Sequence, residues 1–166
     1  MHPLRRHCRI LTGGIVASLA LAFGASNSLA QPDATRLTVT TSSVVFDPPT
    51  VDDYRKGFVA SAQGITFTVA TQNGTLRRLA TVSIRGTAAT VGGGKPVGDV
   101  QWRRADRPDW NSLTLLDMDV EGRQMTDVLN NPWTNGILFR VRVTWAADAP
   151  ATYTADILVT LTQILQ

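Results

Sequence analysis

The stretch ILFRVRVTW, residues 137–145, decides the fold class. Apolar side chains occupy every second position, and mostly arginine and threonine stand between them. A period of two is typical of a β-strand that turns one face to a core and the other to water. The face expected in the core holds Ile137, Phe139, Val141, Val143 and Trp145.

The next segment, YTADILVTL at residues 153–161, repeats the pattern. Its expected inner set is Tyr153, Ala155, Ile157, Val159 and Leu161. Residues 146–151, AADAPA, separate the two segments and contain the aspartate and proline common in turns. We therefore expect residues 137–163 to form a long antiparallel hairpin at the centre of the core.

Alternation of the same kind continues toward the N-terminus, and no window shows a capped helical period. The turn signals include Asn73-Gly74, the glycine-rich loop 92–96 and Glu121-Gly122. Asn73-Gly74-Thr75 also matches a glycosylation sequon, but a hairpin turn is the favoured interpretation. About seven to nine short strands predict an all-β, antiparallel two-sheet sandwich of immunoglobulin-like type. The other expected strands are 37–41, 44–46, 65–71, 79–85, 100–103 and 113–120.

The first thirty residues read as a secretory signal peptide. Arg5, Arg6 and Arg9 precede an apolar run over 11–23, and the small-x-small sequence 28–30 marks a cleavage site. The domain organisation expected is therefore a signal peptide, 1–30, and one sandwich domain, 31–166. No second apolar span follows, so no transmembrane segment is expected in the mature chain, which would be periplasmic, extracellular or at the cell surface.

Removing residues 1–30 changes the available chemistry. Both histidines and the single cysteine leave with them, and 13 basic and 13 acidic residues remain, for a net charge of zero. A neutral chain lacks the basic field that dominates nucleic-acid binding. Triads and thiol nucleophiles are also excluded, so we expect no enzyme and no cofactor. Hydrolysis of glycosides by paired carboxylates is a weaker third option.

Two tryptophans are candidate ligand-binding residues. Trp110 and Trp133 stand in polar segments, where exposed rings can stack on sugar faces while neighbouring Asn and Asp bind hydroxyls. The favoured alternative is that they close the ends of the sandwich, because large aromatic side chains are usually buried. Trp110 ends the stretch WRRADRPDW, residues 102–110, whose first tryptophan, Trp102, is expected to point into the core before the chain turns.

Acidic residues offer one candidate metal site. Asp117, Asp119 and Glu121 occupy alternate positions before Gly122, as at the start of a calcium-binding loop. The bidentate glutamate that such a loop needs at its twelfth position is replaced by Val128. A solvated acidic strand face is therefore favoured. The pair Asp52-Asp53 is interpreted as part of an exposed loop after two prolines.

The two ends of the mature chain, FDPPTVDDYRKG (46–57) and FRVRVTWAADAPATYTADILVTLTQ (139–163), resemble exported bacterial sandwich domains of the fimbrial and spore-coat-U kind. The resemblance implies the architecture and no functional residue, and the paired cysteines common in those families are absent. The expected function is a non-enzymatic structural or adhesive module of a pilus-like or coat-like assembly, with protein partners or self-assembly. The alternative is a small carbohydrate-binding module.

Overall fold

Two antiparallel sheets make up the fold in the computed structural model, which describes residues 34–72 and 76–166. The all-β sandwich predicted from the alternation is confirmed. The residues expected to form a signal peptide, 1–30, and those expected to form the Asn73-Gly74 turn lie outside the described residues. The elements are β1 (Ala34–Val39), β2 (Ser43–Phe46), α1 (Val51–Lys56), β3 (Phe58–Ala60), β4 (Ile65–Gln72), β5 (Arg78–Gly86), the 3-10 helix η1 (Val97–Asp99), β6 (Val100–Arg104), β7 (Asn111–Ser112), β8 (Met118–Met125), β9 (Trp133–Arg142) and β10 (Tyr153–Leu165).

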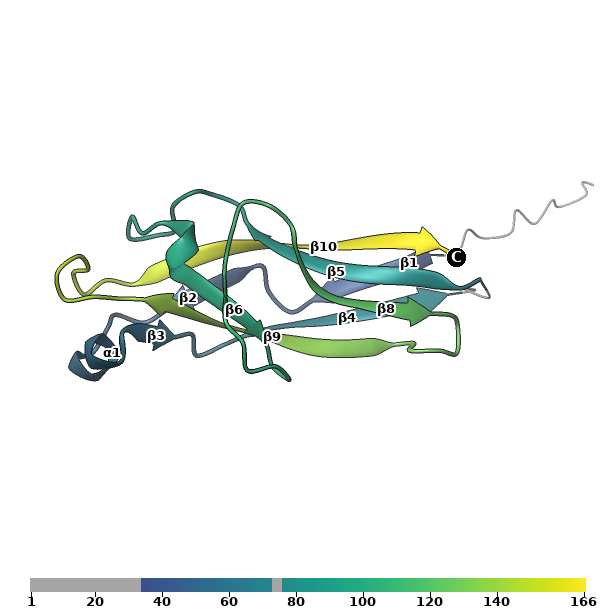
Figure 1. Ribbon diagram of the computed structural model, residues 1–166, viewed down its shortest axis with the longest axis horizontal. Helices are drawn as coiled ribbons and strands as arrows, with labels where there is room; N and C mark the ends of the chain where they lie inside the picture. The colour runs from purple at the N-terminus through teal and green to yellow at the C-terminus, as the bar shows by residue number, and fades with distance from the viewer. Residues whose placement is uncertain (1–33, 73–75) are drawn as a thin grey trace, which may run out of the picture. The chain divides into compact units, whose positions relative to one another are not determined.

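The larger sheet has the strand order β1-β4-β9-β6-β7, with β3 also paired to β9. The smaller sheet has the order β2-β10-β5-β8 (Figure 1). Ten strands are present in the described residues, against the seven to nine expected, and the two shortest are β7 and β3. No helix among those residues is long and apolar enough to cross a membrane.

The prediction of a hairpin over 137–163 is wrong. β9 lies in the larger sheet and β10 in the smaller one, so residues 143–152 cross between the sheets. Likewise β4 and β5, which flank Asn73-Gly74 in the sequence, belong to opposite sheets. Both sheets turn their apolar faces to one core, so alternation reveals the buried face of a strand without revealing its sheet.

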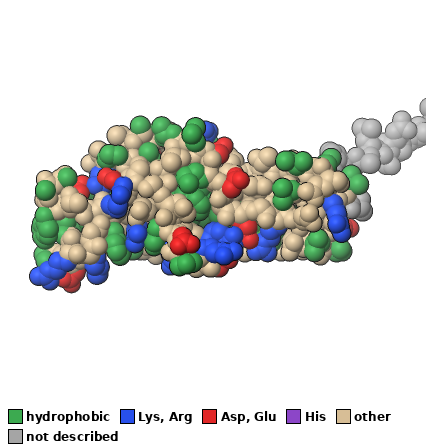
Figure 2. All heavy atoms as spheres, in the orientation of Figure 1, with side chains coloured by type: hydrophobic (Ala, Val, Ile, Leu, Met, Phe, Trp, Pro, Cys, Tyr) green, Lys and Arg blue, Asp and Glu red, His purple; other side chains and the backbone are tan. Residues whose placement is uncertain are grey.

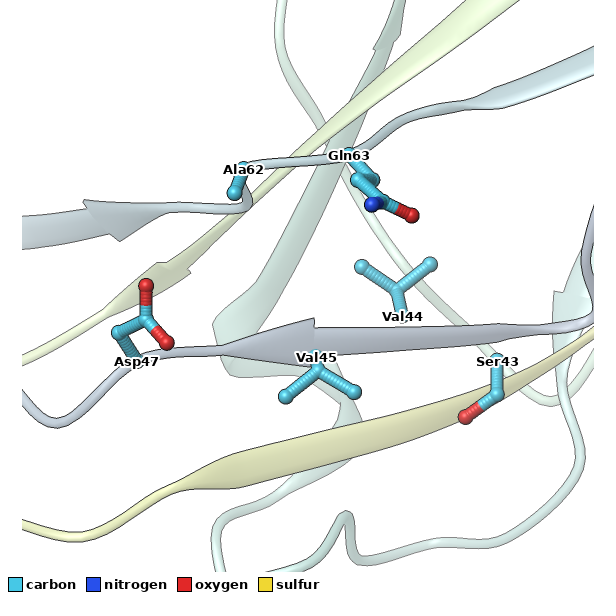
Figure 3. Close-up of a pocket in the computed structure, with 6 residues that line it drawn as sticks. All are labelled: Ser43, Val44, Val45, Asp47, Ala62 and Gln63. Atoms are coloured by element: carbon cyan, nitrogen blue, oxygen red, sulfur yellow. The ribbon is translucent and has the colours of Figure 1, made fainter.

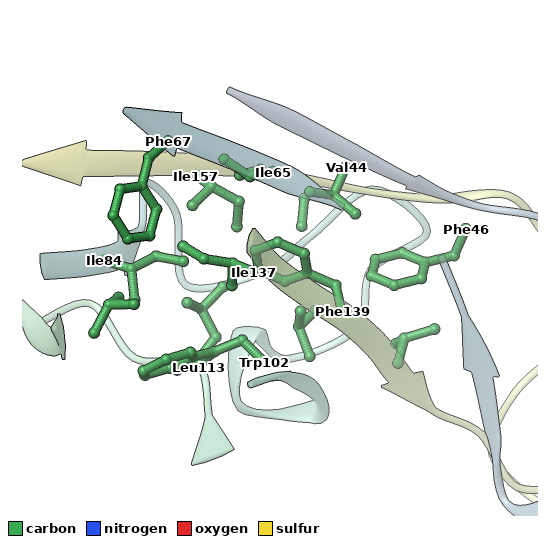
Figure 4. Packing of buried hydrophobic residues seen from close by; sticks show 14 of the residues in the cluster. Val44, Phe46, Ile65, Phe67, Ile84, Trp102, Leu113, Ile137, Phe139 and Ile157 are labelled. Atoms are coloured by element: carbon green, nitrogen blue, oxygen red, sulfur yellow. The ribbon is translucent and has the colours of Figure 1, made fainter. Parts of the chain in front are cut away.

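The inner faces predicted for the two segments are largely confirmed. Alternate residues of β9 and β10 meet in the core between the sheets (Figure 4). Trp145 is the exception, because β9 ends at Arg142 and the alternation continues only to the buried Val143. Its side chain is 63% exposed and stacks on the ring of Tyr54, with 4.1 Å between the ring centroids.

Asp52 and Asp53 lie in the short helix α1 (Val51–Lys56), where an exposed loop was expected. Thr50 and Asp53 make a capping box at the start of α1: the Asp53 amide donates to Thr50 Oγ1 at 3.2 Å, and the Thr50 amide donates to Asp53 Oδ2 at 3.0 Å. Gly57 ends the helix in the left-handed conformation, with φ of 80°. Helix α1 thereby places Tyr54 against the loop between β9 and β10.

Candidate functional site

One side of the sandwich leaves strand edges without partners. β1 is the edge of the larger sheet and pairs only with β4. β10 pairs with β2 only over 153–156, and its remaining residues pair only with β5 on the opposite side. Within the described residues, no strand therefore covers β10 beyond Ile157 on this side, and β1 lies next to it (Figure 1).

Apolar side chains flank this open side, which we call the β1–β10 edge. Leu37 and Val39 of β1 and Val159 and Leu161 of β10 pack against the core, but each is only partly buried. The corresponding inner residues of the central strands β4 and β5, for example Phe67 and Val82, are fully buried. The β1–β10 edge thus combines unpaired backbone groups with an incompletely covered core.

The edge of the smaller sheet at β2 is covered differently. The Ser61 hydroxyl donates to the backbone oxygen of Val45 at 3.0 Å and so occupies one backbone acceptor of that strand. A shallow pocket of about 260 Å³ lies between β2 and residues 62–63, lined by Ser43, Val44, Val45, Asp47, Ala62 and Gln63 (Figure 3). The β1–β10 edge is consequently the more accessible route for an added strand.

The opposite side of the sandwich is closed by charged groups. Glu121 of β8 reaches across to the larger sheet, where its Oε1 lies 3.4 Å from Arg104 Nη2 of β6 and its Oε2 accepts from Asn135 Nδ2 of β9 at 2.8 Å. Arg123 contacts the same carboxylate at 2.7 Å, and Asp106 pairs with Arg104. The hydrogen bonds that Arg104 donates to Asp106 raise the pKa of Arg104, against the effect of burial. Figure 2 shows basic and acidic side chains next to one another over β8 and β9.

A β-bulge separates the three acidic candidates. Val120 has no partner on β5, so Val82 pairs with Glu121 and Ser83 with Asp119. The extra residue turns Glu121 inward, and its side chain is 7% exposed. Asp119 instead faces solvent, and Asp117 pairs with Arg85. The interpretation of one shared acidic face is therefore wrong. Among the described residues, no three His, Cys, Asp or Glu side chains meet at a metal-binding spacing.

The prediction of a turn at Glu121-Gly122 is wrong as well, because both residues lie inside β8. The strand expected over 113–120 begins only at Met118. Beside the bulge is a cleft of about 300 Å³, lined by Trp102, Arg104, Arg107, Asp109, Asn111, Asp119 and Val120. Much of the stretch 102–110 therefore borders this cleft.

The two candidate tryptophans do not form one ledge. Trp133 begins β9 and is 4% exposed, with its Nε1 donating to Met125 Sδ at 2.9 Å and its ring edge-on to Phe67. Trp110 is only partly buried and lies against Arg140. Arg140 follows Trp133 by seven residues on β9, which is a separation of roughly 23 Å at the usual strand rise. The closing role favoured from the sequence fits Trp133.

Trp102 points into the core, as expected, and is 4% exposed. Its indole Nε1 is buried and has no hydrogen-bond partner in the described part of the chain. The glycine-rich loop 92–96 is anchored by Lys95, 7% exposed, which pairs with Asp148 and Asp99. Sequence reasoning missed the Lys95–Asp148 pair and the Arg140 guanidinium on Trp110, because each joins segments far apart in the chain.

No family model, no curated protein and no solved structure matches this chain.

Proposed function

We propose that this chain is an exported structural or adhesive module that joins a pilus-like or coat-like assembly through the β1–β10 edge. The observation that carries the proposal is the unpaired edge of β10 beyond Ile157, next to half-buried Leu37, Val39, Val159 and Leu161. An extended segment of a neighbouring copy would pair with this edge through main-chain hydrogen bonds and cover the apolar residues with alternate side chains.

Several features support strand addition over docking of a folded surface. A bare strand edge is a ready template for pairing, and stable proteins usually protect such edges with charge, proline or a covering loop. The segment 157–165 has no charged residue and no proline. By contrast, the other side of the sandwich is closed by the Glu121 network, and Ser61 occupies a backbone acceptor of β2.

The carbohydrate-binding alternative that pairs Trp110 with Trp133 is not supported, because Trp133 is buried against Phe67. A stacking platform needs an exposed ring.

The test uses two charged substitutions on neighbouring positions of β10. Leu161→Lys places an ammonium at the β1–β10 edge, whereas Thr162→Lys adds the same charge one residue away at an exposed position. The mature protein is examined by light scattering and electron microscopy over a range of concentrations. We expect wild type and Thr162→Lys to form higher-mass species and Leu161→Lys to remain monomeric and folded.

Hydrogen exchange gives a second measurement that does not depend on a variant. Amides of 158–165 that point away from β5 should exchange fast in the monomer and become protected in the assembled form. A wild-type protein that stays monomeric at millimolar concentration, or an assembly that Leu161→Lys leaves intact, would overturn the proposal.

A further inference from the structure

A column of stacked aromatic and guanidinium groups lies on the outer face of the larger sheet. The Arg140 guanidinium carbon lies 4.3 Å from the Trp110 ring centroid and 4.7 Å from that of Phe58. Arg103 lies over Trp110 at 5.2 Å. Arg140 alternates with the buried Phe139 and Val141 on β9, which places it on the face away from the core.

The charges in this column are not balanced. Within the described residues, neither Arg103 nor Arg140 has a carboxylate within ion-pair distance, and Arg103 Nη1 donates only to the backbone oxygen of Arg107. The neighbouring Arg142 pairs with Asp99 at 3.1 Å, but Asp99 is shared with Lys95. Burial, followed by repulsion from Arg103 and Arg142, lowers the pKa of Arg140.

Stacking leaves the guanidinium edges available. Aromatic rings contact the flat faces of a guanidinium, whose N–H donors all lie in its plane. Arg140 uses Nε to donate to Gln101 Oε1 at 2.8 Å, and its terminal nitrogens make no hydrogen bond within the described part of the chain. The terminal nitrogens of Arg140 therefore present free donors in a fixed position, and Arg103 adds a second guanidinium whose Nε is buried without a hydrogen-bond partner in the described part of the chain.

We propose that Trp110, Arg103 and Arg140 form a binding site for the anionic groups of an acidic polysaccharide. Planar, paired donors match a carboxylate or sulfate group, and an anion would offset the repulsion among the arginines. This binding activity goes beyond the proposed assembly role, and the site is on a sheet face rather than at the β1–β10 edge.

The charge distribution favours a polysaccharide over a nucleic acid. Duplex binding depends on many phosphate contacts spread along a basic surface. In this column only Arg103 and Arg140 carry unpaired charge, and residues 31–166 have no net charge. Asp109, next to Trp110 in the sequence, is exposed and borders the separate cleft with Arg104 and Arg107.

The experiment measures binding of the mature protein to four polymers at low salt: alginate, dextran sulfate, neutral dextran and single-stranded DNA. The variants are Arg140→Gln, Arg103→Gln and Arg140→Lys, and the matched control is Arg55→Gln on α1, which removes one positive charge from an exposed ion pair. Circular dichroism melts establish that each variant folds.

We expect alginate or dextran sulfate to bind. The polymer that binds more tightly shows whether the site prefers carboxylate, as in alginate, or sulfate, as in dextran sulfate. Arg140→Gln and Arg103→Gln should each weaken binding at least tenfold, and Arg55→Gln less than twofold. Arg140→Lys should also weaken it, because lysine keeps the charge but loses the planar fork. Equal losses in Arg55→Gln, preferred binding to DNA, or no preference over neutral dextran would overturn the proposal.

Discussion

Lys95 Nζ lies 2.5 Å from Asp148 Oδ1, and the two side chains are 8% and 7% exposed. The pair joins the glycine-rich loop to the segment that crosses between the sheets, and Asp99 Oδ2 lies 3.3 Å from the same ammonium. Asp148 also accepts from the Thr144 amide at 2.8 Å, and its backbone oxygen accepts from Tyr54 at 2.7 Å. This buried pair therefore holds together the end of the sandwich at which α1 lies (Figure 1).

Removing the ammonium should destabilise the fold. Lys95→Met leaves the Asp148 carboxylate buried without its main partner, which costs about 3 kcal/mol in comparable cases. Chemical denaturation monitored by tryptophan fluorescence measures the loss. Lys56→Met on the exposed end of α1 is the control and should change the free energy of unfolding by less than about 0.5 kcal/mol. Equal effects of the two substitutions would contradict a stabilising role for the pair.

The same pair predicts how stability depends on pH. Burial raises the pKa of Asp148. The hydrogen bonds from Lys95 and Thr144 lower it by more than burial raises it, so the pKa lies below the ordinary 3.8. Burial lowers the pKa of Lys95, but its bonds to Asp148 and Asp99 raise it above the ordinary 10.5. The contribution of Asp148 is present above pH 3.8 and is lost as the pH falls through its lower folded value. The contribution of Lys95 to stability is present below pH 10.5 and is lost as the pH rises through its higher pKa in the folded state.

Melting temperatures of the wild type and Lys95→Met across pH 2 to 11 check this dependence. The difference between them should be largest at neutral pH and should shrink as the pH falls, because protonation relieves the unpaired Asp148 carboxylate in the variant. A difference that stays constant to pH 2 would show that the lost stability comes from packing.

The layered fold could be predicted from sequence because its cause is local. Alternation in ILFRVRVTW and YTADILVTL follows from the geometry of a strand with one buried face, and the residues Ile137 to Val143 behave accordingly. The pairing of strands depends on contacts between distant segments. Proximity in the sequence therefore suggested a β9–β10 hairpin that the structure does not contain.

The candidate site was less predictable for a related reason. A single unpaired residue, Val120, reverses the alternation of β8 and sends Glu121 into the interior, and no turn residue marks that position. Trp133 stands in a polar context, yet it starts a strand and is buried. The stacking of Arg140 on Trp110 joins β9 to the segment before β7, which no local pattern encodes. The capping box at Thr50 and Asp53 was the one missed element with a readable local signature.

Val143 lies beyond the end of β9 but is 1% exposed, and its amide donates to the Gly57 oxygen at 3.0 Å. Val143→Asp would bury an unpaired carboxylate and should destabilise the fold by about 3 kcal/mol or more. Arg142→Gln, one residue away with a side chain 53% exposed, should cost less than about 1 kcal/mol. Thermal melts of both proteins provide the measurement, and a tolerated Val143→Asp would place this residue outside the core.

Calcium should leave the melting temperature unchanged. A ligand that binds only the folded state raises the melting temperature, but Glu121 is already occupied by Arg104, Arg123 and Asn135, and Asp119 faces the other way. Differential scanning fluorimetry with millimolar calcium or with a chelator tests this expectation. A rise of several degrees that Asp119→Asn abolishes would restore the calcium hypothesis.

The Glu121 network should contribute to stability by joining the two sheets. Glu121→Gln keeps the size of the side chain but removes the charge that faces Arg104 and Arg123, and hydrogen bonds to charged groups contribute about 2 kcal/mol each. We expect a loss of that order in urea denaturation. The control is Asp117→Asn, whose partner Arg85 lies 3.7 Å away with both side chains over 40% exposed, and it should have almost no effect. If both substitutions are neutral, the partly exposed Arg123 and the pairing of Arg104 with Asp106 would suffice to keep this side closed without the carboxylate.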